Sequence, residues 1–408
     1  MTFMLNYTNL KYKPTDKDLV CEFYVEPNKV TMEKACEQVA AESSIGTWTT
    51  ISTMNPRIAE KLRPTVFSVK GNTVKIAYPQ DLFEAGNMPE ILSSIAGNIF
   101  GMKTVKNLRL NDIMFPKSIV KAFKGPRFGK EGVRKLTKVN NRPLCGTIVK
   151  PKVGLNPAEH AKVAYEAWAG GLDIVKDDEN LSSMTFNKFE TRIAKTLEAR
   201  DNAQSETGEK KIYMPNITAE TMKMLERAEY VKSLGGEYIM VDILTCGWAG
   251  LQTVRDANLN MIIHAHRAGH AAFTRNKKHG ISMKVIGKVA RVIGVDQLHI
   301  GTAVGKMEGS ADEVVDIKKG IEEEMHGIRP VLAVSSGGLH PGHTPDLVKI
   351  LGKDIVAQYG GGCHGHPEGT RSGAIAIRQS IEAATKGITL KEYAKSRPEL
   401  ALALKKWG

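Results

Sequence analysis

The sequence predicts an α/β protein in which a C-terminal (β/α)8 TIM barrel is preceded by a small ferredoxin-like α+β domain. Two observations carry this prediction. From residue 146 onward, an apolar strand, a polar loop and an amphipathic helix recur, about eight times in roughly 260 residues, which are the repeat and the size of such a barrel. Before that point the elements are short and mixed. The 408 residues suffice for both domains, which we place at 1–125 and 126–408.

Each element follows from its local pattern. Apolar runs and alternation predict strands, and a period of 3.6 residues predicts helices. In the first domain we expect strands at 19–25, 48–51, 66–69, 74–77 and 108–113, and helices at 31–41 and 88–99. In the barrel we expect strands at 147–153, 173–176, 212–216, 238–243, 261–266, 297–300, 331–334 and 355–358. Helices are expected between them, for example at 158–169, 186–203, 220–234, 285–293, 311–325 and 372–386.

Composition narrows the class of protein. No apolar run approaches membrane-spanning length and the N-terminal segment lacks a signal-peptide core, so we expect a cytoplasmic protein without a membrane partner. The five cysteines include no C-x-x-C pair, which favours reduced thiols. The net charge is +13, but basic residues alternate with acidic ones and aromatics are only 6%. We therefore expect an anionic small substrate rather than nucleic acid.

The most informative segment is GGLDIVKDDEN, residues 170–180. Lys176 and three carboxylates follow an apolar stretch, and burying such charges is costly unless something compensates them. Clustered carboxylates are the oxygen ligands that Mg²⁺ prefers. The Lys176 ammonium would repel the metal, whereas a carbamate formed from its amine and CO₂ would bind it. Taken alone, the segment fits a surface salt-bridge cluster better, and the rest of the barrel argues against that interpretation.

Barrels of this kind carry their catalytic groups at the C-terminal ends of the strands. Nearly every unusual residue of the second domain stands there. These residues are Lys150 and Lys152, the run 176–179, Asn216, the run 264–267, His299 with 301–306, the run 336–338 and the run 360–362. One rim of the barrel therefore collects the candidate functional side chains.

Two glycine-rich segments indicate phosphate binding. Ser336-Gly337-Gly338 and Gly360-Gly361-Gly362 follow strands seven and eight, where barrels commonly bind phosphate through backbone N–H groups. Either segment alone is equally well explained as a tight turn. Arg267 and His299 are cationic candidates for a second phosphate, so the rim predicts a bisphosphate substrate.

The histidines and the lysine loop each allow an alternative. His264, His266 and His270 have the spacing of a zinc site in amidohydrolase-type enzymes, but that H-x-H pair normally ends the first strand. We expect His266 to act as an acid/base or substrate contact and His264 to be buried. The segment 301–309 places Lys306 between glycines, which is typical of a mobile lid and also of a surface loop.

Motifs along almost the whole chain resemble the large subunit of Rubisco, ribulose-1,5-bisphosphate carboxylase/oxygenase, in family order. The archaeal small-subunit-free type, form III, is the more similar one. The motifs are AAESSIGTWTT (40–50), AGNIFGM (96–102), GTIVKPKVGL (146–155), the run 170–180, HAHRAGHAAFTRN (264–276), HIGTAVGKMEG (299–309), SSGGLHPGH (335–343) and QYGGGCHGHPEG (358–369).

The resemblance implies carboxylation of D-ribulose 1,5-bisphosphate by CO₂ and water to two 3-phosphoglycerates, with O₂ competing. It implies a Mg²⁺ cofactor held by carbamylated Lys176 with Asp178 and Glu179. Lys150, His266 and Lys306 would join Lys176 as catalytic residues. The implied substrate-binding residues are Glu42, Thr47, Trp48, Asn98, Lys152, Arg267, His299, Ser336, Gly337, Gly338, Gln358, Gly360 and Gly361.

The resemblance also implies an assembly. Glu42, Thr47, Trp48 and Asn98 would reach the barrel of a neighbouring chain, so a homodimer or a larger homo-oligomer is expected, without a small subunit. The chain departs from the family in a shortened segment after Lys306, in Cys363-His364 where Thr-Leu is usual, and in ending at residue 408 without a lid-latching tail. The alternatives are a Rubisco-like enolase or isomerase that does not carboxylate and a metal-dependent hydrolase.

Overall fold

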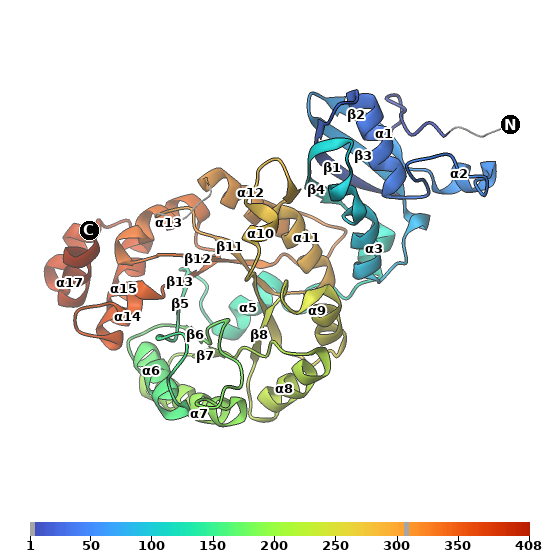
Figure 1. The fold of residues 1–408 in the computed structure, drawn as a ribbon. Helices are drawn as coiled ribbons and strands as arrows, with labels where there is room; N and C mark the ends of the chain where they lie inside the picture. Colours follow the sequence, from blue (N-terminus) through green and yellow to red (C-terminus); the bar gives the residue numbers. More distant parts are fainter. Residues whose placement is uncertain (1–4, 306–309) are drawn as a thin grey trace. The chain divides into compact units, whose positions relative to one another are not determined.

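The computed structural model describes residues 5–305 and 310–408. The chain divides into two compact units, each described here by itself (Figure 1). The first contains Met1–Gly125, Gly269–Ile293 and Glu324–Ile328, and the second contains Pro126–Ala268, Gly294–Glu323 and Arg329–Gly408. The first unit thus includes two segments from the second half of the sequence. The domain boundary after residue 125 stays a prediction about how the chain is organised.

The first unit is built on a mixed five-stranded sheet in the order β10-β4-β1-β3-β2. Strands β1 to β4 pair antiparallel in the order expected for a ferredoxin-like domain, and the short strand β10 joins β4 in parallel. The strands are β1 (Asp18–Pro27), β2 (Thr65–Lys70), β3 (Thr73–Pro79), β4 (Val105–Met114) and β10 (Gly280–Ile281). The helices are α1 (Met32–Glu42), α2 (Pro56–Leu62), α3 (Met88–Ile95), α4 (Lys117–Lys121), α10 (Ala271–Thr274) and α11 (Met283–Ile293), with 3-10 turns at Gln80–Leu82 and Asn98–Gly101.

Two expectations for this unit were wrong. Residues 48–51 form bends and coil instead of a strand, because Trp48, Thr49 and Thr50 are all exposed and no apolar face is buried. The helix expected at 88–99 ends at Ile95, and a separate 3-10 turn begins at Asn98. Between them, a Cβ on Gly97 would lie 2.0 Å from the Ser93 carbonyl oxygen, so only glycine fits this break.

The second unit is the predicted barrel of eight parallel strands, in the order β7-β6-β5-β13-β12-β11-β9-β8. An isolated parallel bridge between Asn216 and Met240 brings the two ends of this sheet together. The strands are β5 (Leu144–Ile148), β6 (Ile174–Lys176), β7 (Ile212–Met214), β8 (Tyr238–Asp242), β9 (Ile262–His266), β11 (Gln297–Gly301), β12 (Leu332–Ser336) and β13 (Ile355–Gln358).

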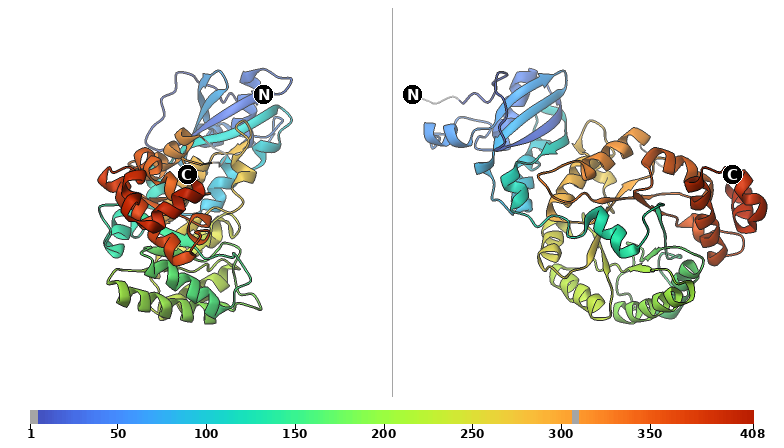
Figure 2. Two further views of the ribbon diagram at one scale, coloured as in Figure 1. Left: turned by 90° about the vertical axis from the view of Figure 1, so that its left-hand side faces the viewer. Right: turned by 180° about the vertical axis from the view of Figure 1, so that it is seen from behind.

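Helices surround these strands, as the view from behind shows (Figure 2). The longer ones are α6 (Pro157–Ala169), α7 (Phe189–Thr207), α8 (Thr221–Ser233), α9 (Gly247–Asp256), α12 (Ala311–Glu322), α13 (Thr344–Leu351), α15 (Thr370–Lys386) and α17 (Pro398–Trp407). Shorter ones are α5 (Gly129–Thr137), α14 (Gly361–His364) and α16 (Leu390–Tyr393), with 3-10 turns at Pro341–His343 and Ala394–Ser396. No helix among the described residues is long and apolar enough to cross a bilayer.

The apolar core of the barrel leaves the C-terminal ends of the strands available for polar, functional side chains. Ile174, Ile212, Tyr238 and six other strand residues form one fully buried apolar cluster, and Val133 of α5 packs into it. Burying this area is the main free-energy term that holds the strands together. Side chains at the C-terminal ends of the strands lie beyond this cluster. The strand expected at 147–153 is instead Leu144–Ile148, because Pro151 has no N–H with which to continue a ladder.

Candidate functional site

Lys176 ends β6 and is almost fully buried, with 1% of its side chain exposed. Its Nζ donates to the Asp177 carbonyl oxygen at 2.8 Å, lies 3.4 Å from Met240 Sδ and is 3.6 Å from Glu179 Oε2. Burial lowers the pKa of Lys176, and Glu179 and Asp178 offset this only in part. The neutral amine, which is the nucleophilic form, is therefore more accessible here than on a surface lysine.

Asp178 and Glu179 lie beside Lys176 among cationic side chains. Asp178 is 1% exposed and accepts a hydrogen bond from Lys150 Nζ at 2.7 Å. Burial raises the pKa of Asp178, but Lys150 and the backbone N–H of Asn180 hold it below its usual value. Glu179 lies within ion-pair distance of Lys176, and its Oε1 is 3.9 Å from Lys152 Nζ. In this structure, ammonium groups compensate the two carboxylates predicted to bind metal.

Asp177, between these residues, belongs to a different network. Its carboxylate accepts from Tyr213 Oη at 2.6 Å and from Arg192 Nε at 3.2 Å, and His160 Nε2 is 3.1 Å away. Although burial raises the pKa of Asp177, Arg192 and the other donors bring it well below the usual range. Successive residues of an extended segment point to opposite sides, so Asp177 faces helices α6 and α7 while its neighbours face the rim.

The histidines at β9 and β11 form a contiguous group. His264 is fully buried between Gln297 Oε1 and His299 Nε2, each 2.9 Å from a ring nitrogen, and burial lowers its pKa to about 3. This confirms the expectation of a buried His264. His299 Nδ1 is 2.7 Å from Ser336 Oγ. Burial, with His266 and His264 nearby, takes the pKa of His299 well below its usual value, which disfavours the cationic form considered in the sequence analysis.

His266 occupies a more open position, with 16% of its side chain exposed. Its Nδ1 is 2.6 Å from Asp242 Oδ1, and its Nε2 is 3.6 Å from Glu179 Oε2. Asp242 therefore fixes the ring and leaves Nε2 facing the carboxylates. Arg267 follows, and burial lowers its pKa to about 10. A Cβ on Gly301 would lie 2.8 Å from Arg267 Nη2, so the glycine makes room for the guanidinium.

The glycine segments and Gln358 complete the rim. Gly337 and Gly338 follow β12 with positive φ angles of 121° and 66°, which favour glycine. Gly360 precedes α14, and a Cβ there would lie 3.6 Å from Lys150 Cε. Gln358 ends β13 with 1% exposure, and within the described chain neither atom of its amide has a hydrogen-bond partner. A buried amide without partners is costly, so Gln358 is suited to a polar ligand.

The remaining predicted residues lie elsewhere. Glu42, Thr47, Trp48 and Asn98 belong to the first unit, where Trp48 is 82% exposed and Asn98 is also exposed. Thr47 and Trp48 line a cavity of about 310 Å³ within that unit. Lys306 lies outside the described residues.

Four side chains that support the rim were not selected from the sequence. Asp242 holds His266, and Asn180 donates twice to Asp178 Oδ1, each time at 3.1 Å. Asn216, noted only for its strand end, donates to the Glu179 and Leu181 carbonyl oxygens. His364 Nε2 is 2.9 Å from both the Ile148 carbonyl oxygen and Thr147 Oγ1. A polar residue at a strand end was the available signal for Asp242 and Asn216; His364 stood out only as a departure from the family.

Comparisons with known proteins agree with this geometry. Residues 130–407 match the family described as the ribulose bisphosphate carboxylase large chain, catalytic domain, and residues 6–119 match its N-terminal domain. A protein of Methanocaldococcus jannaschii named ribulose bisphosphate carboxylase is 52% identical, covering 99% of this chain and 100% of the relative. One of the same name from Pyrococcus abyssi is 50% identical, covering 99% and 96%.

Solved structures give the same result. The octameric ribulose-1,5-bisphosphate carboxylase/oxygenase of Pyrococcus horikoshii, in complex with sulfate ion, has a TM-score of 0.95 at 48% identity, covering 98% of this chain and 96% of that one. The dimeric archaeal Rubisco of Hyperthermus butylicus has a TM-score of 0.91 at 43% identity, covering 98% of both chains.

Proposed function

Because the chain belongs to the family of the ribulose bisphosphate carboxylase large chain, we propose that it carboxylates D-ribulose 1,5-bisphosphate. CO₂ and water are the co-substrates, two 3-phosphoglycerates are the products, and O₂ competes with CO₂. The observation that carries the proposal is the meeting of Lys176, Asp178 and Glu179 with Lys150 and His266 at one rim of the barrel.

The donor set fits Mg²⁺ once Lys176 is carbamylated. Among the described side chains, no group of three or more His, Cys, Asp or Glu is placed to hold a metal ion. Asp178 and Glu179 supply two anionic ligands, and a carbamate on Lys176 would supply the third. The lowering of the Lys176 pKa by burial favours reaction of its amine with CO₂. Bound Mg²⁺ would supply Lewis-acid polarisation of the substrate ketone and replace Lys150 in compensating Asp178.

The protein's own groups account for the proton movements. Lys176, once carbamylated, would be the residue placed to accept the proton at C3 of the substrate. His266, fixed by Asp242, acts on the substrate hydroxyls through Nε2. Lys150, with Lys152 as its cationic neighbour, delivers a proton to the carbanion that is left after cleavage. Lys306 would stabilise the new carboxylate.

The substrate phosphates are assigned to two sides of the rim. Arg267 would hold one phosphate as a cation, and His299 would contribute a hydrogen bond. Gly338, Gly360 and Gly361 would hold the other through backbone N–H groups, with Gly337 shaping the loop. Ser336 and Gln358 would orient the sugar between them.

The proposal is tested with ribulose bisphosphate, Mg²⁺ and labelled CO₂, after preincubation with CO₂ and Mg²⁺. Label in 3-phosphoglycerate is the expected result. Enolisation of the substrate without fixation of label would identify the non-carboxylating enolase instead. Activity that needs Zn²⁺ and no CO₂ would point to a hydrolase.

We also propose that active sites are shared between subunits of a homo-oligomer without a small subunit. Glu42, Thr47, Trp48 and Asn98 would complete the site of a partner chain. The dimeric and octameric assemblies of the similar archaeal proteins support this. Two inactive variants, Glu42→Gln and Lys176→Ala, should regain activity when mixed, because one of two shared sites carries neither change. No recovery in mixed dimers verified by mass spectrometry would mean that each site is built within one chain.

A further inference from the structure

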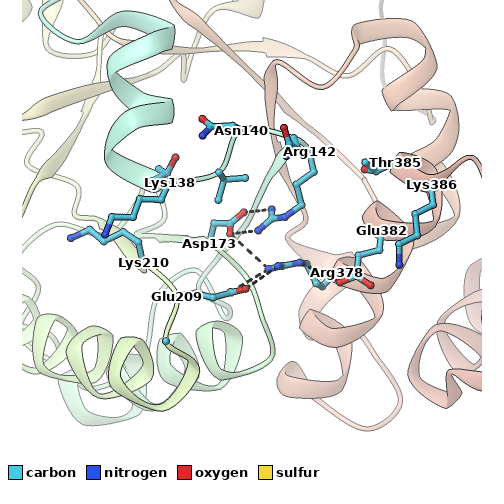
Figure 3. A pocket seen from close by; sticks show the side chains of 14 residues that line it. Lys138, Asn140, Arg142, Asp173, Glu209, Lys210, Arg378, Glu382, Thr385 and Lys386 are labelled. Carbon is cyan, nitrogen blue, oxygen red and sulfur yellow. Dashed lines mark hydrogen bonds and ion pairs between the residues drawn. The ribbon is translucent and has the colours of Figure 1, made fainter.

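A cavity of about 460 Å³ opens at the end of the barrel opposite the rim (Figure 3). Its lining comes from residues 137–142 before β5, Asp173 at the start of β6, residues 208–210 before β7, and the last turns of α15. The lining residues before β5, β6 and β7 lie at the N-terminal ends of these strands, whereas the predicted catalytic residues lie at the C-terminal ends of the barrel strands. The cavity is therefore separate from the rim, and its size is that of a site for a small molecule.

Arginines already compensate the carboxylates in this cavity. Asp173, 2% exposed, forms a bidentate pair with Arg142, with both N–O distances at 2.7 Å. Glu209 is 2.9 Å from Arg378 Nη2 and from Lys211 Nζ. Although partial burial raises the pKa of Glu209, these two cations lower it to about 2. The dashed lines in Figure 3 mark the contacts among Arg142, Asp173, Arg378 and Glu209.

Two lysines and two asparagines that line the mouth of the cavity have no carboxylate partner among the described residues. Lys138 and Lys386 are exposed, and within the described chain neither has a carboxylate at ion-pair distance. Lys386 Nζ is 3.4 Å from Tyr393 Oη and 5.5 Å from the centroid of the same ring, which leaves its charge without an acidic partner. The side chains of Asn140 and Asn141 donate to no described residue. Figure 3 shows Lys138 and Lys386 on opposite sides of the cavity.

We propose that this cavity binds a small organic anion that carries phosphate, at a site distinct from the bisphosphate site of the rim. The carboxylates of the cavity are held by other cations, so the two lysines have no carboxylate partner among the described residues, and the amides of Asn140 and Asn141 supply neutral donors. The aliphatic stems of the lysines and Val139 provide apolar walls for the organic part. The proposal is independent of the reaction catalysed at the rim.

The test uses inorganic pyrophosphate at low ionic strength, with hydrogen–deuterium exchange to locate binding. Pyrophosphate should slow exchange in peptides that cover 137–142 and 207–211. In the variant Lys138→Ala/Lys386→Ala this protection should need about tenfold more pyrophosphate, since each exposed charge contributes modestly. Rim peptides report binding to the substrate site separately.

The matched control is Lys349→Ala/Lys391→Ala, which removes two exposed lysines elsewhere on the same unit. Its protection should equal that of the unchanged protein. Three helices end at this cavity, and lysines are favourable at helix C-termini without any ligand. Absence of protection, or equal weakening in both variants, would show that the lysines serve only the helix ends and would overturn the proposal.

Discussion

Acidification should destabilise the barrel through His364, which links the glycine segment to β5. The ring lies at the end of α14, two residues after Gly362, and both of its nitrogens have partners. Nε2–H donates to the Ile148 carbonyl oxygen at 2.9 Å, and Nδ1 accepts from Thr370 Oγ1 at 3.0 Å. This arrangement satisfies both nitrogens of the neutral ring. Burial accordingly lowers the pKa of His364 from 6.5 to about 4.

The sign and size follow from proton linkage. Between the folded pKa and the unfolded one, the unfolded chain binds more protons, so stability is present at neutral pH and is lost as the pH falls through this window. From pH 7 to pH 5, the loss from this residue is about 2 kcal/mol in the free energy of unfolding. Below the folded pKa, His364 contributes no further change.

The assay compares urea unfolding of the unchanged protein and His364→Gln at pH 7 and pH 5. Glutamine keeps a donor toward Ile148 but does not titrate. The variant should lose about 2 kcal/mol less on acidification than the unchanged protein, whatever its stability at pH 7. Parallel losses in the two proteins would refute the assignment of a neutral, doubly bonded ring.

Three further changes test other parts of the second unit. Lys176→Ala should abolish fixation of labelled CO₂ while circular dichroism stays unchanged, because a rim group and not the core is lost; near-normal fixation would contradict the proposed role. Asp242→Asn should lower kcat roughly tenfold or more without changing the fold, since His266 loses its anionic partner; an unchanged kcat would remove Asp242 from the positioning of that ring. Asp173→Asn should lower the free energy of unfolding by about 3–5 kcal/mol, measured with urea, because Arg142 is left partly buried and unpaired; a loss within experimental error would mean that water replaces the carboxylate.

Most of the barrel could be predicted from the sequence because its signals are local. Strands such as β8 and β13 are continuous apolar runs bounded by polar residues, and the burial of both strand faces imposes that pattern. The rim also followed, since the C-terminal ends of parallel strands in a barrel lie at one end. The family motifs added specific roles, which the geometry alone would not have assigned.

Residues 48–51 show where local reasoning failed. Their β-branched residues favour a strand, but a strand requires a partner and a buried face, and neither is encoded within four residues. The sequence also did not predict that residues 269–293 belong to the first unit, because β10 pairs with β4 across about 170 positions of sequence.

The sequence by itself determined which elements form and at which strand ends the polar residues stand, because periodicity and residue type act over a few neighbours. Only the tertiary structure decided which partner each of those polar side chains contacts. Asp177 contacts Arg192, whereas Asp178 contacts Lys150. Burial lowers the pKa of His299, whereas His266 stays partly exposed beside Asp242. Charge state and partner depend on the atoms that surround a side chain after folding. Those atoms come from strands and helices distant in the sequence.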